Sequence, residues 1–148
     1  MVCTFFGHRD LCGGYENRLE ALLTDLIENK NVTRFYVGNE GSFDYTVRRT
    51  LGEIKRKYPH IDYAVVLAYP THRSDDALNG ITIYPEGLES VPPRYAINKR
   101  NLWMIEQADY VVVYVKVSFG GAARCKEIAE KKGKIVFNLA DYMSFKIF

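Results

Sequence analysis

The chain has 148 residues, of which 47% are hydrophobic and 26% are charged, and its formal net charge is +2. This length suits a single domain, and the composition is that of a folded globular protein rather than a disordered one. A net charge so close to zero does not favour wholesale nucleic-acid binding, although it leaves a local basic pocket open.

Membrane and metal classes have no support in the sequence. No apolar run approaches the ~20 residues that cross a bilayer, and the first residues lack the basic and apolar regions of a secretory signal. Cys3, Cys12 and Cys125 are odd in number and lack metal-ligand spacing. We therefore expect a cytoplasmic protein with no disulfide framework, no metal site and no cofactor, in which Cys3 packs as a small apolar residue.

The first half of the chain reads as alternating strands and helices. Residues 2–6 predict a strand, and residues 15–30 predict a helix because leucine and isoleucine recur there at the spacing of one helical face. A second strand is expected at 34–37, followed by a turn at 38–41. Ser42 is a candidate N-cap for the next helix, whose inward face would be Phe43, Val47, Leu51 and Ile54 and which would end at Tyr58-Pro59.

The second half continues the alternation after an irregular stretch. The continuous apolar run at 63–68 is typical of a parallel strand covered on both faces. Residues 71–94 form a proline-containing excursion with a short edge strand at 81–84. A helix is then predicted from about 95 to 107, a strand at 110–115, a helix from Gly120-Gly121 to Lys132, and a last strand at 135–139.

Strands that alternate with helices predict one α/β domain over residues 1–148. Its sheet would be doubly wound and mostly parallel, with helices on both faces, in a Rossmann-like architecture. In such sheets, ligands bind outside the carboxyl ends of the strands, so the loops that follow the strands predict one binding rim. Glycine turns that lead into helices there could bring backbone N–H groups close to a phosphate.

The candidate ligand-binding residues lie in the loops after three strands. They are Gly7, His8, Arg9, Gly38, Asn39, Gly41, Asp44, Ser118, Gly120 and Gly121. Each has a simpler alternative. The glycines could serve turn geometry alone, His8 could cap a turn, and Asp44 could complement the helix macrodipole. Adjacent Lys99 and Arg100 could form a solvated helix face, and Glu127 could be one member of an exposed ion pair.

The segments TFFGHRD, VGNEGSFD, YPEGLESVPPRYAINKRNLWMIEQADYVVVYV and SFGGAARCKEIAEKKGK together resemble the SLOG superfamily over nearly the whole chain. The likeness is to its small single-domain bacterial and phage members. The superfamily is related to the Lonely guy phosphoribohydrolases and to the DNA-processing protein that loads recombinase. The resemblance implies a Rossmann-like fold, a nucleotide or nucleotide-derived ligand, and packing as a homodimer.

The Lonely guy enzymes carry an R-K-x-x-M helix and a P-G-G-x-G-T-x-x-E segment, and this chain keeps part of both. Arg100 and Met104 match the first motif, with Asn101 in place of its lysine. Gly120, Gly121 and Glu127 match the second, while Phe119 replaces its proline and Ala123-Arg124 its Gly-Thr pair. By this resemblance, Arg100 and Glu127 would be the catalytic residues if the protein is a hydrolase.

Three functions follow as expectations. The first is binding of a nucleotide-like small molecule in the rim cleft, as in a sensor. The second is cleavage of the N-glycosidic bond of nucleoside 5′-monophosphates by Arg100 and Glu127. The third is a non-catalytic interaction module, in which the excursion at 71–94 and Trp103 meet a partner or a second copy. Trp103 and Met104, on an expected surface helix, also suggest packing between two subunits. Nucleic acid as a partner is left undecided.

Overall fold

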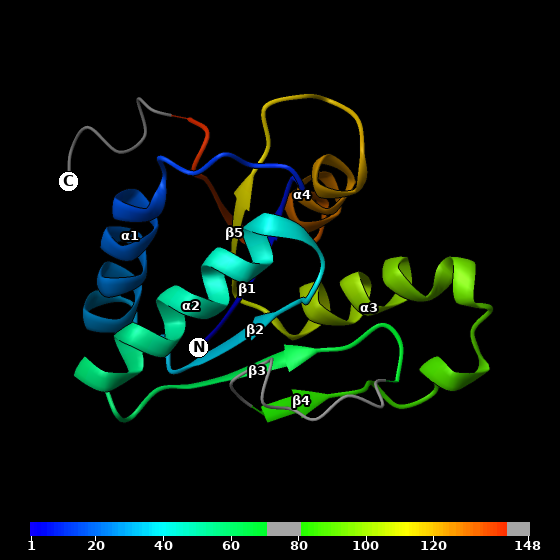
Figure 1. The fold of residues 1–148 in the computed structure, drawn as a ribbon, viewed down its shortest axis with the longest axis horizontal. Coiled ribbons are helices and arrows are strands. Elements are labelled where there is room, and N and C mark those ends of the chain that lie inside the picture. The colour runs from blue at the N-terminus through cyan, green and yellow to red at the C-terminus, as the bar shows by residue number, and fades with distance from the viewer. Residues whose placement is uncertain (71–80, 142–148) are drawn as a thin grey trace.

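The protein is an α/β domain with a single sheet between two layers of helices. The computed structural model describes residues 1–70 and 81–141. Within them, six strands form one all-parallel sheet in the order β4-β3-β2-β1-β5-β6, covered by four α-helices (Figure 1). This is the predicted Rossmann-like, doubly wound architecture, and the sheet is entirely rather than mostly parallel.

The elements of the first half lie where the sequence predicts them. They are β1 (Val2–Gly7), α1 (Glu16–Asn29), β2 (Arg34–Val37), α2 (Gly41–Lys57) and β3 (Asp62–Val66). The predicted N-cap is wrong, because Glu40 holds that position and Ser42 is already inside α2. The Ser42 side chain instead serves the loop after β1, as described below.

The second half contains β4 (Ile81–Ile83), a short 3-10 helix (Leu88–Ser90), α3 (Pro93–Gln107), β5 (Tyr110–Tyr114), α4 (Gly121–Lys131) and β6 (Ile135–Asn138). The predicted edge strand is confirmed as β4. Helix α3 begins at Pro93, since proline suits the first helical position, where no backbone N–H is needed. Of the predicted excursion at 71–94, residues 71–80 lie outside the described part.

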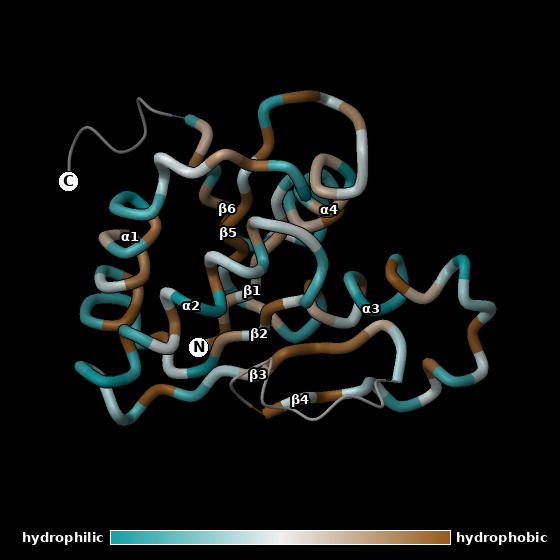
Figure 2. Tube along the Cα trace, in the orientation of Figure 1, coloured by the Kyte–Doolittle hydropathy of each residue, from teal (hydrophilic) through white to brown (hydrophobic). Residues whose placement is uncertain are grey.

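Two apolar cores lie on opposite faces of the sheet. Neighbouring residues of one strand point to opposite faces, so Phe5 joins the core under α1 and α2, whereas Phe6 joins the core under α3 and α4. In Figure 2, helix α1 turns its hydrophobic side toward the sheet. Cys3 is fully buried in β1, as expected, and burial raises the pKa of its thiol.

Helix α3 differs from the expected surface helix. Met104 is buried in the core, and Trp103 packs against Tyr36 of β2 with the ring centroids 5.2 Å apart. The prediction that Met104 lies on the surface is therefore wrong, whereas Trp103 is partly buried and its contact with a partner stays a prediction. Their apolar side chains bind α3 to the sheet, which fixes the position of the other residues on this helix.

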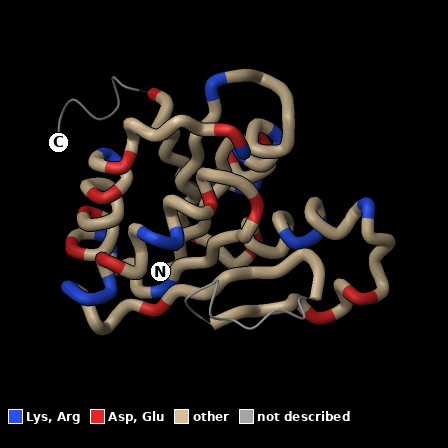
Figure 3. Tube along the Cα trace, viewed as in Figure 1, with Lys and Arg blue, Asp and Glu red and all other residues tan. Residues whose placement is uncertain are grey.

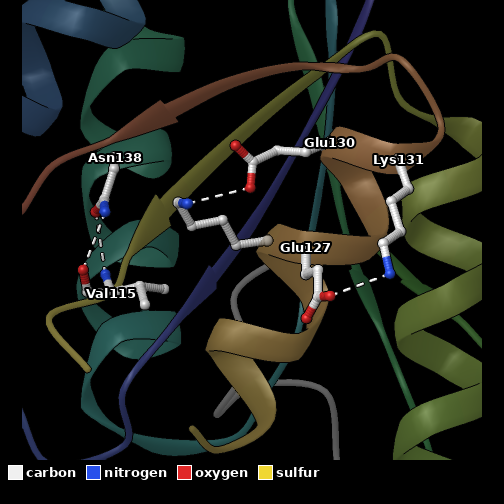
Figure 4. A network of polar contacts seen from close by, with 6 residues as sticks. Val115, Glu127, Glu130, Lys131 and Asn138 are labelled. Atoms are coloured by element: carbon white, nitrogen blue, oxygen red, sulfur yellow. Dashed lines mark hydrogen bonds and ion pairs between the residues drawn. The ribbon is translucent and has the colours of Figure 1, made fainter. Parts of the chain in front are cut away.

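The strand ends create the topological switch point. Strand β1 pairs with β2 on one side and with β5 on the other. The strand order therefore runs from β1 to β4 in one direction and then from β1 to β6 in the opposite direction. Asn138 at the end of β6 closes the far side, because its side chain accepts the Val115 N–H at 3.1 Å and donates to the Val115 carbonyl at 2.9 Å (Figure 4). The loops after β1, β2 and β5 thereby share one rim, where ligands bind in sheets of this kind.

Gly7 at the end of β1 is required by packing. A Cβ built at this position would lie 2.3 Å from Cγ of the buried Phe43. We predict that Gly7→Ala lowers the free energy of unfolding by about 1–3 kcal/mol, because the core must shift to admit the methyl group. Chemical denaturation measures this effect.

The control for this change is Gly52→Ala inside α2, where the added Cβ meets Tyr63 Oη at an ordinary 3.5 Å. It should leave stability unchanged or raise it by about 0.5–1 kcal/mol, since alanine favours helix more than glycine does. Equal stability of Gly7→Ala and the natural protein would contradict the packing role.

Candidate functional site

A cavity of ≈ 200 Å³ lies at the carboxyl ends of the strands and is called the rim cavity here. The loop after β1, the start of α2, the middle of α3 and the start of α4 form its walls. Its lining includes six predicted site residues, Gly7, His8, Arg9, Asp44, Arg100 and Gly121. Segments far apart in the sequence therefore meet at the rim predicted from strand order.

Arg100 is the most deeply placed charge of the rim cavity. Its residue is only 3% exposed, on the inward face of α3 with Ala96 and Met104. Nη1 donates to the Val66 carbonyl at the end of β3 at 3.2 Å and to Asn39 Oδ1 at 3.4 Å. Burial lowers the pKa of the guanidinium, against the opposing effect of Asp44 and Glu40. The alternative of a solvated Lys99-Arg100 face is wrong for Arg100.

Asp44 faces the same cavity from the first turn of α2 and is 7% exposed. Its Oδ2 accepts the backbone N–H of Glu40 at 3.0 Å, so it does stabilise the helix start, as the simpler alternative predicts. Burial raises the pKa of this carboxyl to about 6, although the Glu40 N–H and the Arg100 charge oppose the shift. Asp44 therefore holds its charge at neutral pH at a cost.

Gly38 brings these two charges close to each other. A Cβ at Gly38 would lie 2.7 Å from Asp44 Oδ2 and 3.0 Å from Arg100 Nη1, so no other residue fits there without displacing one of them. Yet the two side chains form no ion pair. The described part of the chain holds three ion pairs, which join Lys55 to Asp62, Lys126 to Glu130 and Lys131 to Glu127.

Hydrogen bonds between loops hold the rim together. The Ser42 hydroxyl donates to the Arg9 carbonyl at 2.7 Å and accepts the Leu11 N–H at 2.8 Å. Gly41 packs directly on this loop, because its φ of +89° and a Cβ position 2.7 Å from Arg9 Cα leave room for no side chain. His8 Nε2 accepts the Lys116 N–H at 3.0 Å, which links the loops after β1 and β5.

A second hollow of ≈ 410 Å³ adjoins the rim cavity at Gly121 and is called the Gly120 hollow. It is lined by Asn98, Ser118, Phe119, Gly120, Gly121, Arg124 and Glu127. The first backbone N–H groups of α4 lie here, and a helix start carries partial positive charge. Arg124 adds a full positive charge. This surface suits an anion such as a phosphate.

Arg100 and Glu127, the pair implied by the resemblance, line different hollows. Arg100 lies in the rim cavity, whereas Glu127 lies on the outer side of α4 with a side chain that is 64% exposed. Figure 4 shows its carboxylate paired with Lys131, at 3.0 Å. The structure thus bears out the exposed ion pair at Glu127 and does not bring the two residues into one cavity.

Sequence reasoning missed six lining residues of the rim cavity. Three are the apolar Phe6, Ile97 and Ala122, and the other three, with polar or ionisable side chains, are Glu40, Asn101 and Cys125. Asn101 accepts the Arg100 Nε–H at 3.0 Å through Oδ1, and burial raises the pKa of the Cys125 thiol to about 11. The signal for Cys125 was present, because it and Ala129 are four residues apart on the face of α4 that meets the sheet.

The described residues offer no metal site and no membrane-spanning helix. They contain no group of three or more His, Cys, Asp and Glu side chains that could hold a metal ion, and none of their helices is long and apolar enough to span a bilayer. In the view of Figure 3, the positions of acidic and basic residues intermingle along the described chain. The rim is the strongest candidate for function.

Comparison with known proteins does not assign this chain to a family. Comparison with models of known protein families and with curated proteins finds no match for this chain.

The raised pKa of Asp44 gives a prediction for stability. The folded protein binds this proton more tightly than the unfolded chain, so the protonated carboxyl stabilises the fold fully below pH 3.8, and this contribution is lost as the pH rises through about 6. The side chain at this position of the Asp44→Asn variant stays neutral at every pH. The stability of this variant minus that of the natural protein should therefore increase by about 2 kcal/mol from pH 4 to pH 8.

Denaturant unfolding at both pH values measures this difference. The matched control is Asp62→Asn, which makes the same change at an exposed carboxylate on β3. A stability difference between Asp44→Asn and the natural protein that does not change with pH would show that burying the charge costs nothing.

Proposed function

We propose that the protein binds a nucleotide-like small molecule across the rim cavity and the Gly120 hollow, and that it does not cleave it. The observation that carries this proposal is the pair Arg100 and Asp44. Both are buried at the carboxyl ends of the strands, side by side at Gly38, without an ion pair between them. Two buried charges that do not neutralise each other are costly for a fold and useful for a ligand.

The dimensions support a ligand in two parts. The rim cavity, at ≈ 200 Å³, is smaller than the roughly 300–1,000 Å³ of pockets that hold a whole drug-sized ligand. Together with the adjoining Gly120 hollow, it offers enough room for a base or sugar on one side and a phosphate on the other. The resemblance to the SLOG superfamily favours the same ligand class.

Cleavage of the N-glycosidic bond has less support. It needs a carboxylate beside the sugar, and Glu127 lies in the Gly120 hollow with its carboxylate paired to Lys131. Asp44 is inside the rim cavity, but it lies beside Arg100 rather than in the Gly120 hollow, where the resemblance places the carboxylate of the cleavage site. No contact in the described residues favours the interaction module, and homodimer formation stays a prediction of the resemblance.

Arg9 provides a test of binding, because it lines the rim cavity but is exposed on the loop after β1. We expect Arg9→Ala to weaken binding of a nucleoside monophosphate about tenfold, since it removes one charge-assisted contact, while the melting temperature stays nearly unchanged. Isothermal titration calorimetry with AMP, GMP, CMP and UMP measures the affinities.

The control variant is Arg49→Ala, which removes an exposed arginine of α2 outside both hollows. It should bind like the natural protein. The same mixtures are analysed by chromatography for free base, and none is expected. If none of the four nucleotides binds, the proposed function fails; if base appears, the protein is a hydrolase.

A further inference from the structure

Asp44 and Arg100 each keep polar atoms that have no partner among the described residues. Asp44 Oδ2 accepts the Glu40 N–H, whereas Oδ1 makes no hydrogen bond to any described residue. Among the described residues, every buried polar side-chain atom has a hydrogen-bond partner. With no partner among the described residues, Oδ1 is the oxygen that we expect to face the rim cavity, which Asp44 lines.

The same argument applies to the guanidinium of Arg100. Nε donates to Asn101, and Nη1 donates to Val66 and Asn39. Nη2 has no partner among the described residues, and because Arg100 lines the cavity we expect Nη2 to face it as well. Within the described residues, the rim cavity thus offers one carboxylate oxygen and one pair of N–H donors without a partner, both on side chains more than nine-tenths buried.

Glu40 adds a second carboxylate to the same wall. It is half-buried, lines the rim cavity, and its side chain forms no hydrogen bond or ion pair with a described residue. Carboxylates only accept hydrogen bonds, and a guanidinium only donates them. The cavity is therefore complementary to a ligand edge that offers hydrogen-bond donors to Asp44 and Glu40 and an acceptor to Arg100.

From this arrangement we infer that the rim cavity recognises guanine. Guanine presents two adjacent donors, N1–H and the N2 amino group, beside the acceptor O6 on one planar edge. Asp44 accepts from the donors and Arg100 Nη2 donates to O6, so the base joins two side chains that form no ion pair with each other. Adenine presents a lone pair at N1, which the carboxylate would repel.

This inference rests on the proposed function, because the phosphate of the same nucleotide would lie at Gly120-Gly121 in the adjoining hollow. A ribose diol also offers donors to a carboxylate, so the experiment has to separate the base from the sugar. Xanthine provides the sharper comparison. It differs from guanine by carrying an acceptor oxygen in place of the N2 amino group.

The test is calorimetric titration of the natural protein and of Asp44→Asn with GMP, XMP, AMP and 2′-deoxy-GMP at pH 8. The natural protein should bind GMP about tenfold or more tightly than AMP or XMP, and 2′-deoxy-GMP as tightly as GMP. In Asp44→Asn the amide donates to O2 of xanthine and accepts from N1–H, so the preference between GMP and XMP should reverse.

Asp62→Asn is the matched control and should keep the natural preference for GMP. Equal binding of GMP, AMP and XMP by the natural protein would overturn the inference while leaving nucleotide binding intact. A loss of affinity for 2′-deoxy-GMP with no discrimination among bases would assign Asp44 to the sugar instead. Loss of all binding in Asp44→Asn without the reversal would also overturn it, and no binding by the natural protein would remove the proposed function as well.

Discussion

The buried guanidinium of Arg100 is the constraint on which the rim depends. It reaches from α3 to the carbonyl of Val66 at the end of β3 and to Asn39 in the loop after β2, so it holds a helix against two strand ends. A buried charge costs several kcal/mol unless it is compensated. Asp44 stands beside it without touching it, which leaves the charge only partly compensated. Proteins accept such costs at functional sites, where a ligand later completes the arrangement.

The positions of the strands and helices along the chain were predictable because the sequence carries strong local signals. Apolar runs such as that of β5 fit strands buried on both faces, and leucines at helical spacing mark α1. The rule that ligands bind at the carboxyl ends of parallel strands then placed the loops after β1 and β2 on one rim. His8, Arg9 and Asp44 meet there for this reason.

The orientation of side chains within that rim was harder to predict. Ser42 has the chemistry of an N-cap, but the loop after β1 packs against the helix start and takes its hydroxyl. Arg100 and Glu127 both sit on helices next to the rim, yet only Arg100 faces inward. Its spacing of four residues from Ala96 and Met104 contained this information, and Glu127, two residues after buried Cys125, lies on another side of α4.

A crystal structure of the protein grown with GMP tests the central claim most directly. The account predicts the guanine edge in the rim cavity, with N1–H and the N2 amino group at Asp44, O6 at Arg100 Nη2, and the phosphate at Gly120-Gly121. A structure with GMP bound outside the rim cavity, or with only water between Asp44 and Arg100 at saturating GMP, would contradict it.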